Sequence, residues 1–144
     1  MTTSMPKPEW AKIGSTSNAD FYEMRSDVLV IVPYPDATDG ESSARESLAM
    51  QKKHWTEVGR RGAVVVWMDP VVSQDSGARG VYANETQGVP TTCYAIVGES
   101  FFAMATASVF TGLAKPGIDT QIFRSLDEAM PWVDEMNKAR GGAL

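Results

Sequence analysis

The chain has 144 residues, of which 43% are hydrophobic and 22% are charged, and its formal net charge is −5. This length fits one domain with an ordinary globular core. The acidic balance argues against a nucleic-acid surface, which needs clustered Lys and Arg. With Cys93 as the single cysteine, an internal disulfide and a thiolate metal cluster are excluded.

The N-terminal stretch lacks the apolar core of a signal peptide. No apolar run reaches the roughly 18 residues that a membrane-spanning helix needs. We therefore expect a cytoplasmic protein that does not insert into a membrane. Residues 1–18 are rich in Ser, Thr, Pro and Lys, and they predict a flexible N-terminal arm ahead of a single domain over residues 19–144.

Apolar runs then predict strands, and several of them are almost uniformly aliphatic, such as "DVLVIVPY" and "GAVVVWMD". Uniformly aliphatic strands are typical of a parallel sheet that is covered on both faces. The first pair is joined by a short link and is expected to be antiparallel. The predicted strands are residues 21–26, 27–34, 62–69, 91–98 and 119–123.

Helical patterns alternate with these strands, which predicts an α/β domain with a largely parallel sheet. Ser43 with Glu46, and Ser125 with Glu128, have the spacing of a capping box. Pro131 lies beyond the first turn of the last predicted helix and should bend it. The predicted helices are residues 42–61, 74–85, 99–114 and 125–142.

The third predicted helix is apolar on nearly all sides. One interpretation is burial between the sheet and a neighbouring helix, and the other is an apolar face left over for a partner. Of the partners, we favour a second copy of the chain, giving a homodimer, over a hydrophobic or lipid ligand. The residues that define this face are Phe101, Phe102, Met104, Phe110 and Leu113.

Three stretches, "VVVWMDPVVSQDSGARGVY", "CYAIVGESFFAMATASVFTGLAKPG" and "IFRSLDEAMPWVDEM", resemble the SpoIIAA-like or STAS family of anti-sigma factor antagonists. The resemblance is closer to an uncharacterised branch of small bacterial proteins. It implies a STAS fold with about five strands in a mostly parallel mixed sheet and about four helices. It also implies a regulatory protein-interaction module whose partner is a kinase-type anti-sigma factor.

In the antagonists of this family, the hydroxyl residue before a motif glycine is phosphorylated. The resemblance places Gly77 on that glycine and Ser76 on the phosphoacceptor, while Asp75 replaces the family's first hydroxyl residue. A phosphate suits a helix N-terminus, which carries unpaired N–H groups and partial positive charge. A plain capping turn is the alternative, because Ser73, Asp75 and Ser76 are all good N-cap residues.

The loops after the second and third strands should lie at the carboxyl edge of the sheet, where α/β proteins bind their partners. The "PDATDGESS" loop has ordinary turn chemistry and lacks EF-hand spacing, so no metal is expected. No phosphate-binding glycine motif is present, and no carboxylate is placed beside His54 or Cys93, so we expect a non-enzymatic protein without a cofactor. The predicted interaction surface is Asp36, Asp39, Asp69, Ser73, Asp75, Ser76, Gly77 and Arg79.

Two alternatives to the interaction module stay open. The first is a carrier of a small hydrophobic or lipid ligand, because the lipid-binding Sec14 fold looks similar to STAS in architecture. The second is a structural homo-oligomer whose function is assembly.

Overall fold

The computed structural model describes residues 5–100 and 118–144. Within them the chain forms a mixed seven-stranded sheet with the order β1-β2-β3-β5-β7-β8, to which β9 adds beside β5. The strands β3, β5, β7 and β8 run parallel, while β1 and β2 are antiparallel additions to β3. The strands are β1 (Ala11–Ser15), β2 (Ala19–Arg25), β3 (Val28–Pro33), β5 (Arg60–Trp67), β7 (Thr91–Val97), β8 (Thr120–Phe123) and β9 (Gly142–Ala143).

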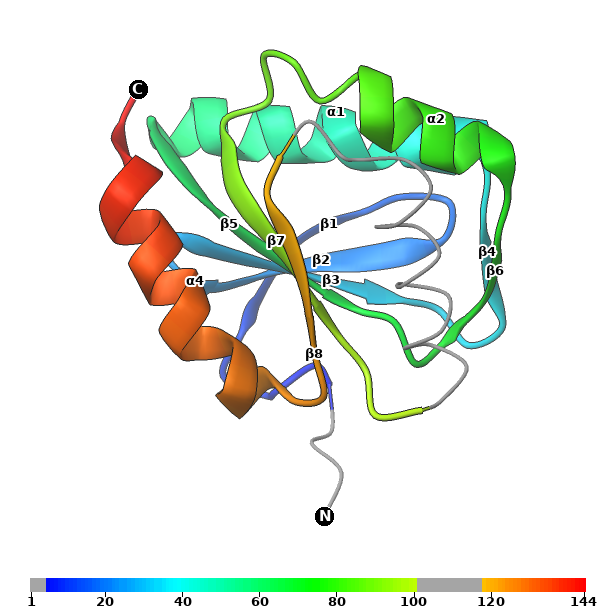
Figure 1. Cartoon of the computed structure of the whole chain (residues 1–144). Coiled ribbons are helices and arrows are strands. Elements are labelled where there is room, and N and C mark those ends of the chain that lie inside the picture. Colours follow the sequence, from blue (N-terminus) through cyan, green and yellow to red (C-terminus); the bar gives the residue numbers. More distant parts are fainter. Residues whose placement is uncertain (1–4, 101–117) are drawn as a thin grey trace.

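Two further strands form a small parallel sheet of their own, in which β4 (Ala37–Asp39) pairs with β6 (Val71–Gln74). Each of these strands leads almost directly into a helix. β4 precedes α1 (Glu41–Val58) and β6 precedes α2 (Ser76–Asn84). Figure 1 shows α1 and α2 on one side of the main sheet and α4 (Leu126–Arg140) on the other.

The helix ends follow local capping chemistry, with one difference from the expected pattern. Ser125 caps α4 by accepting a hydrogen bond from the Glu128 N–H (3.2 Å), as its sequence predicts. The predicted Ser43 cap of α1 is wrong, because Gly40 is the N-cap and Ser43 is the third helical residue. Its hydroxyl accepts from the Gly40 N–H (2.9 Å), so Ser43 closes the helix start from inside.

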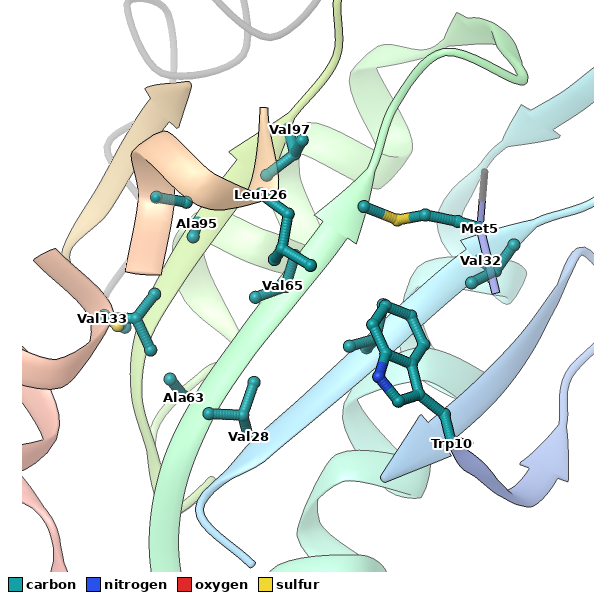
Figure 2. Close-up of a cluster of buried hydrophobic side chains, with 13 residues drawn as sticks. Met5, Trp10, Val28, Val32, Ala63, Val65, Ala95, Val97, Leu126 and Val133 are labelled. Carbon is teal, nitrogen blue, oxygen red and sulfur yellow. The ribbon is translucent and has the colours of Figure 1, made fainter. Parts of the chain in front are cut away.

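One face of the main sheet carries the larger core, which α4 covers. Figure 2 shows how Leu126 and Val133 of α4 meet valines of the central strands. Trp10 and Met5 cover the same cluster further along, and their side chains are only 8% and 7% exposed. The strand residues of this cluster are Val28, Val30, Val32, Ala63, Val65, Cys93, Ala95 and Val97.

The N-terminal segment therefore differs from the predicted flexible arm. Residues 11–15 form β1 and pair with β2 along most of its length. Two physical causes outweigh the polar composition of this segment. β1 satisfies the backbone groups of the β2 edge, and the Trp10 ring is buried on the core. The prediction of an arm over residues 1–18 is wrong for the part that the structure describes.

The other face of the sheet packs against α1, chiefly through Trp55, and α2 packs on α1 rather than on the sheet. Gln51 interrupts the apolar stripe of α1 but is fully buried and fully used. Its Oε1 accepts hydrogen bonds from Tyr94 (2.8 Å) and Thr91 (3.0 Å), and its Nε2 donates to Ser47 (3.1 Å). Because every polar atom of the amide has a partner, this glutamine joins α1 to β7 without an unpaired group.

His54 is buried on α1, and we expect it to make the protein sensitive to acid. Burial lowers the pKa of His54, while Glu23 and Glu57 oppose that shift. Its Nε2 lies 3.8 Å from a Glu23 carboxylate oxygen, and it has no hydrogen-bond partner among the described residues. Between a pH of about 6.5 and the lowered pKa, His54 therefore binds a proton in the unfolded chain and stays neutral in the folded chain.

The free energy of unfolding should consequently fall as the pH drops from 6.5 toward the lowered pKa of His54, by at most about 1.4 kcal/mol per pH unit. Urea denaturation at pH 7.5 and pH 5.5 measures this loss in the wild type and in His54→Gln. The variant should lose less stability over that interval than the wild type. Equal losses in the two proteins would show that His54 titrates alike in the folded and unfolded chains.

Candidate functional site

The small sheet brings the starts of two helices together. The Asp75 N–H donates to the Asp39 carbonyl oxygen (3.0 Å). A Cβ on Gly77 would lie 3.2 Å from the Glu41 Cβ, and a Cβ on Gly40 would lie 3.2 Å from an Asp75 carboxylate oxygen. Both glycines therefore allow a close approach that a side chain would obstruct. We call residues Gly40, Glu41, Asp75, Ser76 and Gly77 the helix-start rim.

At the helix-start rim, the residue that caps α2 differs from the residue whose hydroxyl is exposed. Asp75 is the N-cap of α2, and its carboxylate accepts from the Ala78 N–H (2.9 Å). Ser76 is the first helical residue, its side chain is exposed, and it makes no side-chain hydrogen bond within the described part of the chain. Arg79 stays at the same helix end, because its Nη1 donates to the Gln74 carbonyl oxygen (2.9 Å). The Ser76 hydroxyl is thus open to solvent and is not needed to start the helix.

Asp39 differs from its predicted place on a contact surface, since its carboxylate is engaged inside the protein. It accepts hydrogen bonds from the Tyr82 hydroxyl (2.8 Å) and from the Gln74 amide (3.3 Å). It also accepts one from Ser43 of α1. Burial raises the pKa of Tyr82, and the neighbouring carboxylate of Asp39 raises it further. Asp39 therefore ties α1, β6 and α2 together.

The other two aspartates of the predicted surface lie at a different place. Asp69 follows β5 and accepts the N–H groups of Glu99 (3.2 Å) and Ser100 (2.9 Å). Asp36 is exposed in the turn before β4, with a φ of 60°. Both line an open groove that does not include the helix-start rim. The sequence predicted one continuous surface, and the structure divides its residues between two.

The remaining predicted residues are placed only in part. Ser73 lies in β6 and its backbone pairs with Thr38. The apolar residues Phe101, Phe102, Met104, Phe110 and Leu113 lie outside the described residues. The homodimer and ligand interpretations built on them remain predictions.

A cavity of about 70 Å³ lies between the main sheet and the unit formed by β4, β6, α1 and α2. Phe21, Ile31 and Tyr94 are among its walls, together with the polar residues Asp39 and Gln74. The Oε1 of Gln74 is buried and has no hydrogen-bond partner among the described residues. The sequence carries no signal for this cavity, because its lining residues come from strands and helices that are far apart along the chain.

The described residues contain no group of three metal-binding side chains. No helix among them is long and apolar enough to cross a bilayer. Cys93 is buried in β7, and burial raises the pKa of its thiol to about 11. At neutral pH this cysteine is a thiol within the core, which is the form without nucleophilic reactivity.

The described part of the chain has a SpoIIAA-like fold. A solved structure shows this likeness. It is that of an uncharacterised protein of the DUF3478 family with a SpoIIAA-like fold, from Shewanella loihica PV-4. It aligns with a TM-score of 0.53 and 11% sequence identity, over 83% of this chain and 99% of that one. The predicted STAS resemblance is confirmed for the fold.

Residues 22–137 match the family described as "Domain of unknown function (DUF7793)". The chain belongs to that family. No curated protein matches the sequence. Compared with the predicted sheet of five strands, the described residues add β1 and β9 to the main sheet and form a second sheet from β4 and β6. They contain three helices, and the third of the four predicted helices, residues 99–114, falls mainly outside them.

Proposed function

We propose that this protein is a non-enzymatic regulatory module of the STAS type that acts in the cytoplasm. Its helix-start rim contacts a protein partner, and phosphorylation of Ser76 changes that contact. The proposal is supported by one observation at the start of α2. Asp75 caps the helix, so the exposed Ser76 hydroxyl is not needed as a cap. A kinase-type anti-sigma factor is the partner that the family resemblance implies.

The electrostatics of the rim determine what a phosphate would do there. A phosphate adds about −1.5 to −2 charge, and the free N–H groups at the start of α2 favour an anion. The Asp75 carboxylate and the Cβ of Glu41 lie next to the Cβ position of Gly77, while the Glu41 carboxylate pairs with Arg45 (2.6 Å). The modified rim would carry the phosphate charge next to the Asp75 carboxylate on one small surface. A partner that fits the neutral hydroxyl would then be repelled, without a change of fold.

Affinity capture from the native cell tests this proposal, with phosphopeptide mapping of the protein isolated from that cell. Wild type and Ser76→Ala should capture the same partner, while Ser76→Glu should weaken its capture by at least about tenfold. Thr56→Glu is a matched control, because Thr56 is exposed on α1 and does not belong to the rim. A chain that is never phosphorylated at Ser76, and whose Ser76→Glu variant captures the partner normally, would refute the proposal.

The cavity supports a second candidate function, the carriage of a small and mostly apolar ligand. Its volume of about 70 Å³ exceeds the space of one water molecule. The Gln74 Oε1, which has no hydrogen-bond partner among the described residues, can accept a hydrogen bond from a ligand. Native mass spectrometry of protein from its source distinguishes the candidates. A bound small molecule would support the carrier, a phosphate the switch, and a stable dimer alone the structural homo-oligomer.

A further inference from the structure

The open groove that Asp36 and Asp69 line, which we call the aromatic groove, has its own chemistry. It has a volume of about 830 Å³ and lies on the face of the sheet that carries Tyr22, Val32 and Trp67. Aromatic residues, prolines and aspartates make up most of its described walls. These residues are Met5, Pro6, Asp20, Tyr22, Val32, Pro33, Tyr34, Pro35, Asp36, Trp67, Asp69, Pro70 and Ser100.

The formal charge of the groove lining is negative, because its described residues include three aspartates and neither lysine nor arginine. Asp20 is partly compensated, since Lys12 lies 3.3 Å from its carboxylate. Burial pushes the pKa of Asp20 up, but hydrogen bonds from Tyr34 and Ser15 and the nearby Lys12 outweigh it and leave that pKa lowered. Asp20 is therefore ionised at neutral pH.

Asp36 and Asp69 have no compensating cation within the described part of the chain. From the described residues, Asp69 accepts two neutral backbone N–H groups and no charged donor. Asp36 is exposed and forms no ion pair or side-chain hydrogen bond with the described residues. Two negative charges thus border the groove and are available to a ligand.

The aromatic walls fit the same kind of ligand. Trp67 and Tyr22 are half-buried and pack on the core, so their rings are held by it. Tyr34 is 38% exposed, and its hydroxyl donates to Asp20 (2.7 Å), which fixes the direction of its ring. An aromatic face attracts a guanidinium or ammonium cation through the quadrupole of its ring, and a guanidinium also pairs with carboxylates. The proline walls lack N–H groups, so they contribute no backbone donor that would compete for the carboxylates.

We propose that the aromatic groove binds a basic segment of a protein partner in an extended conformation. An Arg or Lys side chain of that segment lies against the aromatic walls and is paired by Asp36 and Asp69. The volume is in the range of about 300–1,000 Å³ that is usual for ligand sites, which is room for a few peptide residues. The proposal does not depend on phosphorylation at Ser76, because none of the groove residues belongs to the helix-start rim.

Nuclear magnetic resonance titration of the full chain tests the groove, with the peptide acetyl-Arg-Pro-Arg-amide as probe. The backbone amides of the groove residues and the Trp67 indole should shift as the peptide is added. The shifts should be lost with the same peptide carrying citrulline in place of arginine, which keeps the shape and removes the charge. Binding should weaken steeply as salt is raised, because the charges are at the surface.

Asp36→Asn is the decisive variant. Asn tolerates a positive φ as well as Asp does, so this change removes a charge and keeps the turn. It should raise the dissociation constant of the peptide by about two- to fivefold, which corresponds to the usual free-energy contribution of a surface charge pair. Glu135→Gln makes the same change in net charge at an exposed position of α4 outside the groove, and it should leave binding unaltered.

Three results would overturn the proposal. The arginine peptide causes no shifts at the groove residues. The citrulline peptide binds as well as the arginine peptide, which would make the groove a neutral apolar site. Glu135→Gln weakens binding as much as Asp36→Asn does, which would make the attraction a property of the overall charge.

Discussion

Trp55→Ala is expected to lower the free energy of unfolding by about 3–5 kcal/mol, the usual cost of removing a large aromatic side chain from a core. The Trp55 side chain is fully buried between α1 and the sheet. Its indole N–H donates to the Thr91 hydroxyl (3.2 Å), and Thr91 in turn donates to Gln51 (3.0 Å). The substitution therefore opens a cavity and also removes one partner of a buried polar network.

Urea denaturation followed by far-ultraviolet circular dichroism measures this loss. Trp132→Ala is the matched control, because Trp132 of α4 is half-buried and packs on the edge of the core against Phe123. Its loss should be clearly smaller than that of Trp55→Ala. Equal losses in the two variants would contradict the central place given to Trp55.

Asp39→Ala is expected to lower the free energy of unfolding by about 2–4 kcal/mol, because it removes a carboxylate that three part-buried donors share. The Tyr82 hydroxyl and the Gln74 amide each lose the Asp39 carboxylate as an acceptor. The loss should be greatest where the two helices start, since Asp39 joins them. Hydrogen exchange followed by mass spectrometry should therefore show weaker protection in the first turns of α1 and α2 than in the central strands.

Two control variants, Asp39→Asn and Asp36→Asn, separate the loss of hydrogen bonds from the loss of charge. Asp39→Asn keeps one acceptor oxygen and should cost less than Asp39→Ala. Asp36→Asn removes the same charge from an exposed turn and should leave exchange at α1 and α2 unaltered. Uniform protection loss over the whole chain in Asp39→Ala would show that Asp39 contributes general stability and does not organise the rim.

The two proposed surfaces have different relations to these stability predictions. The rim depends on Asp39, which orders both helix starts, so a partner of the rim should bind Asp39→Ala weakly. The aromatic groove depends on strands of the main sheet and on loops after β3 and β5. A variant that loosens the rim should therefore leave binding of a basic peptide to the groove largely intact.

Some parts of this protein follow from its sequence alone, because their causes are local. The aliphatic runs of β3, β5 and β7 belong to strands that are buried on both faces, as uniformly aliphatic strands of a parallel sheet are. Ser125 caps α4 because its hydroxyl needs only a nearby N–H. The SpoIIAA-like fold was predicted from the order of these elements together with three stretches that resemble that family, and the solved structure confirms it.

Other parts were decided only by the tertiary structure, because their causes are contacts between distant segments. Three residues were equally good caps for α2, and the extended backbone at Asp75 selected one of them. β1, β4 and β6 are short and carry weak patterns, and each exists because a neighbouring strand offers an unpaired edge. The same long-range pairing turned Asp39 inward and left Ser76 outside. The sequence determines which residues occur in the loops and helix starts around β4 and β6. The packing of strands that are far apart in the chain determines which of these residues are exposed.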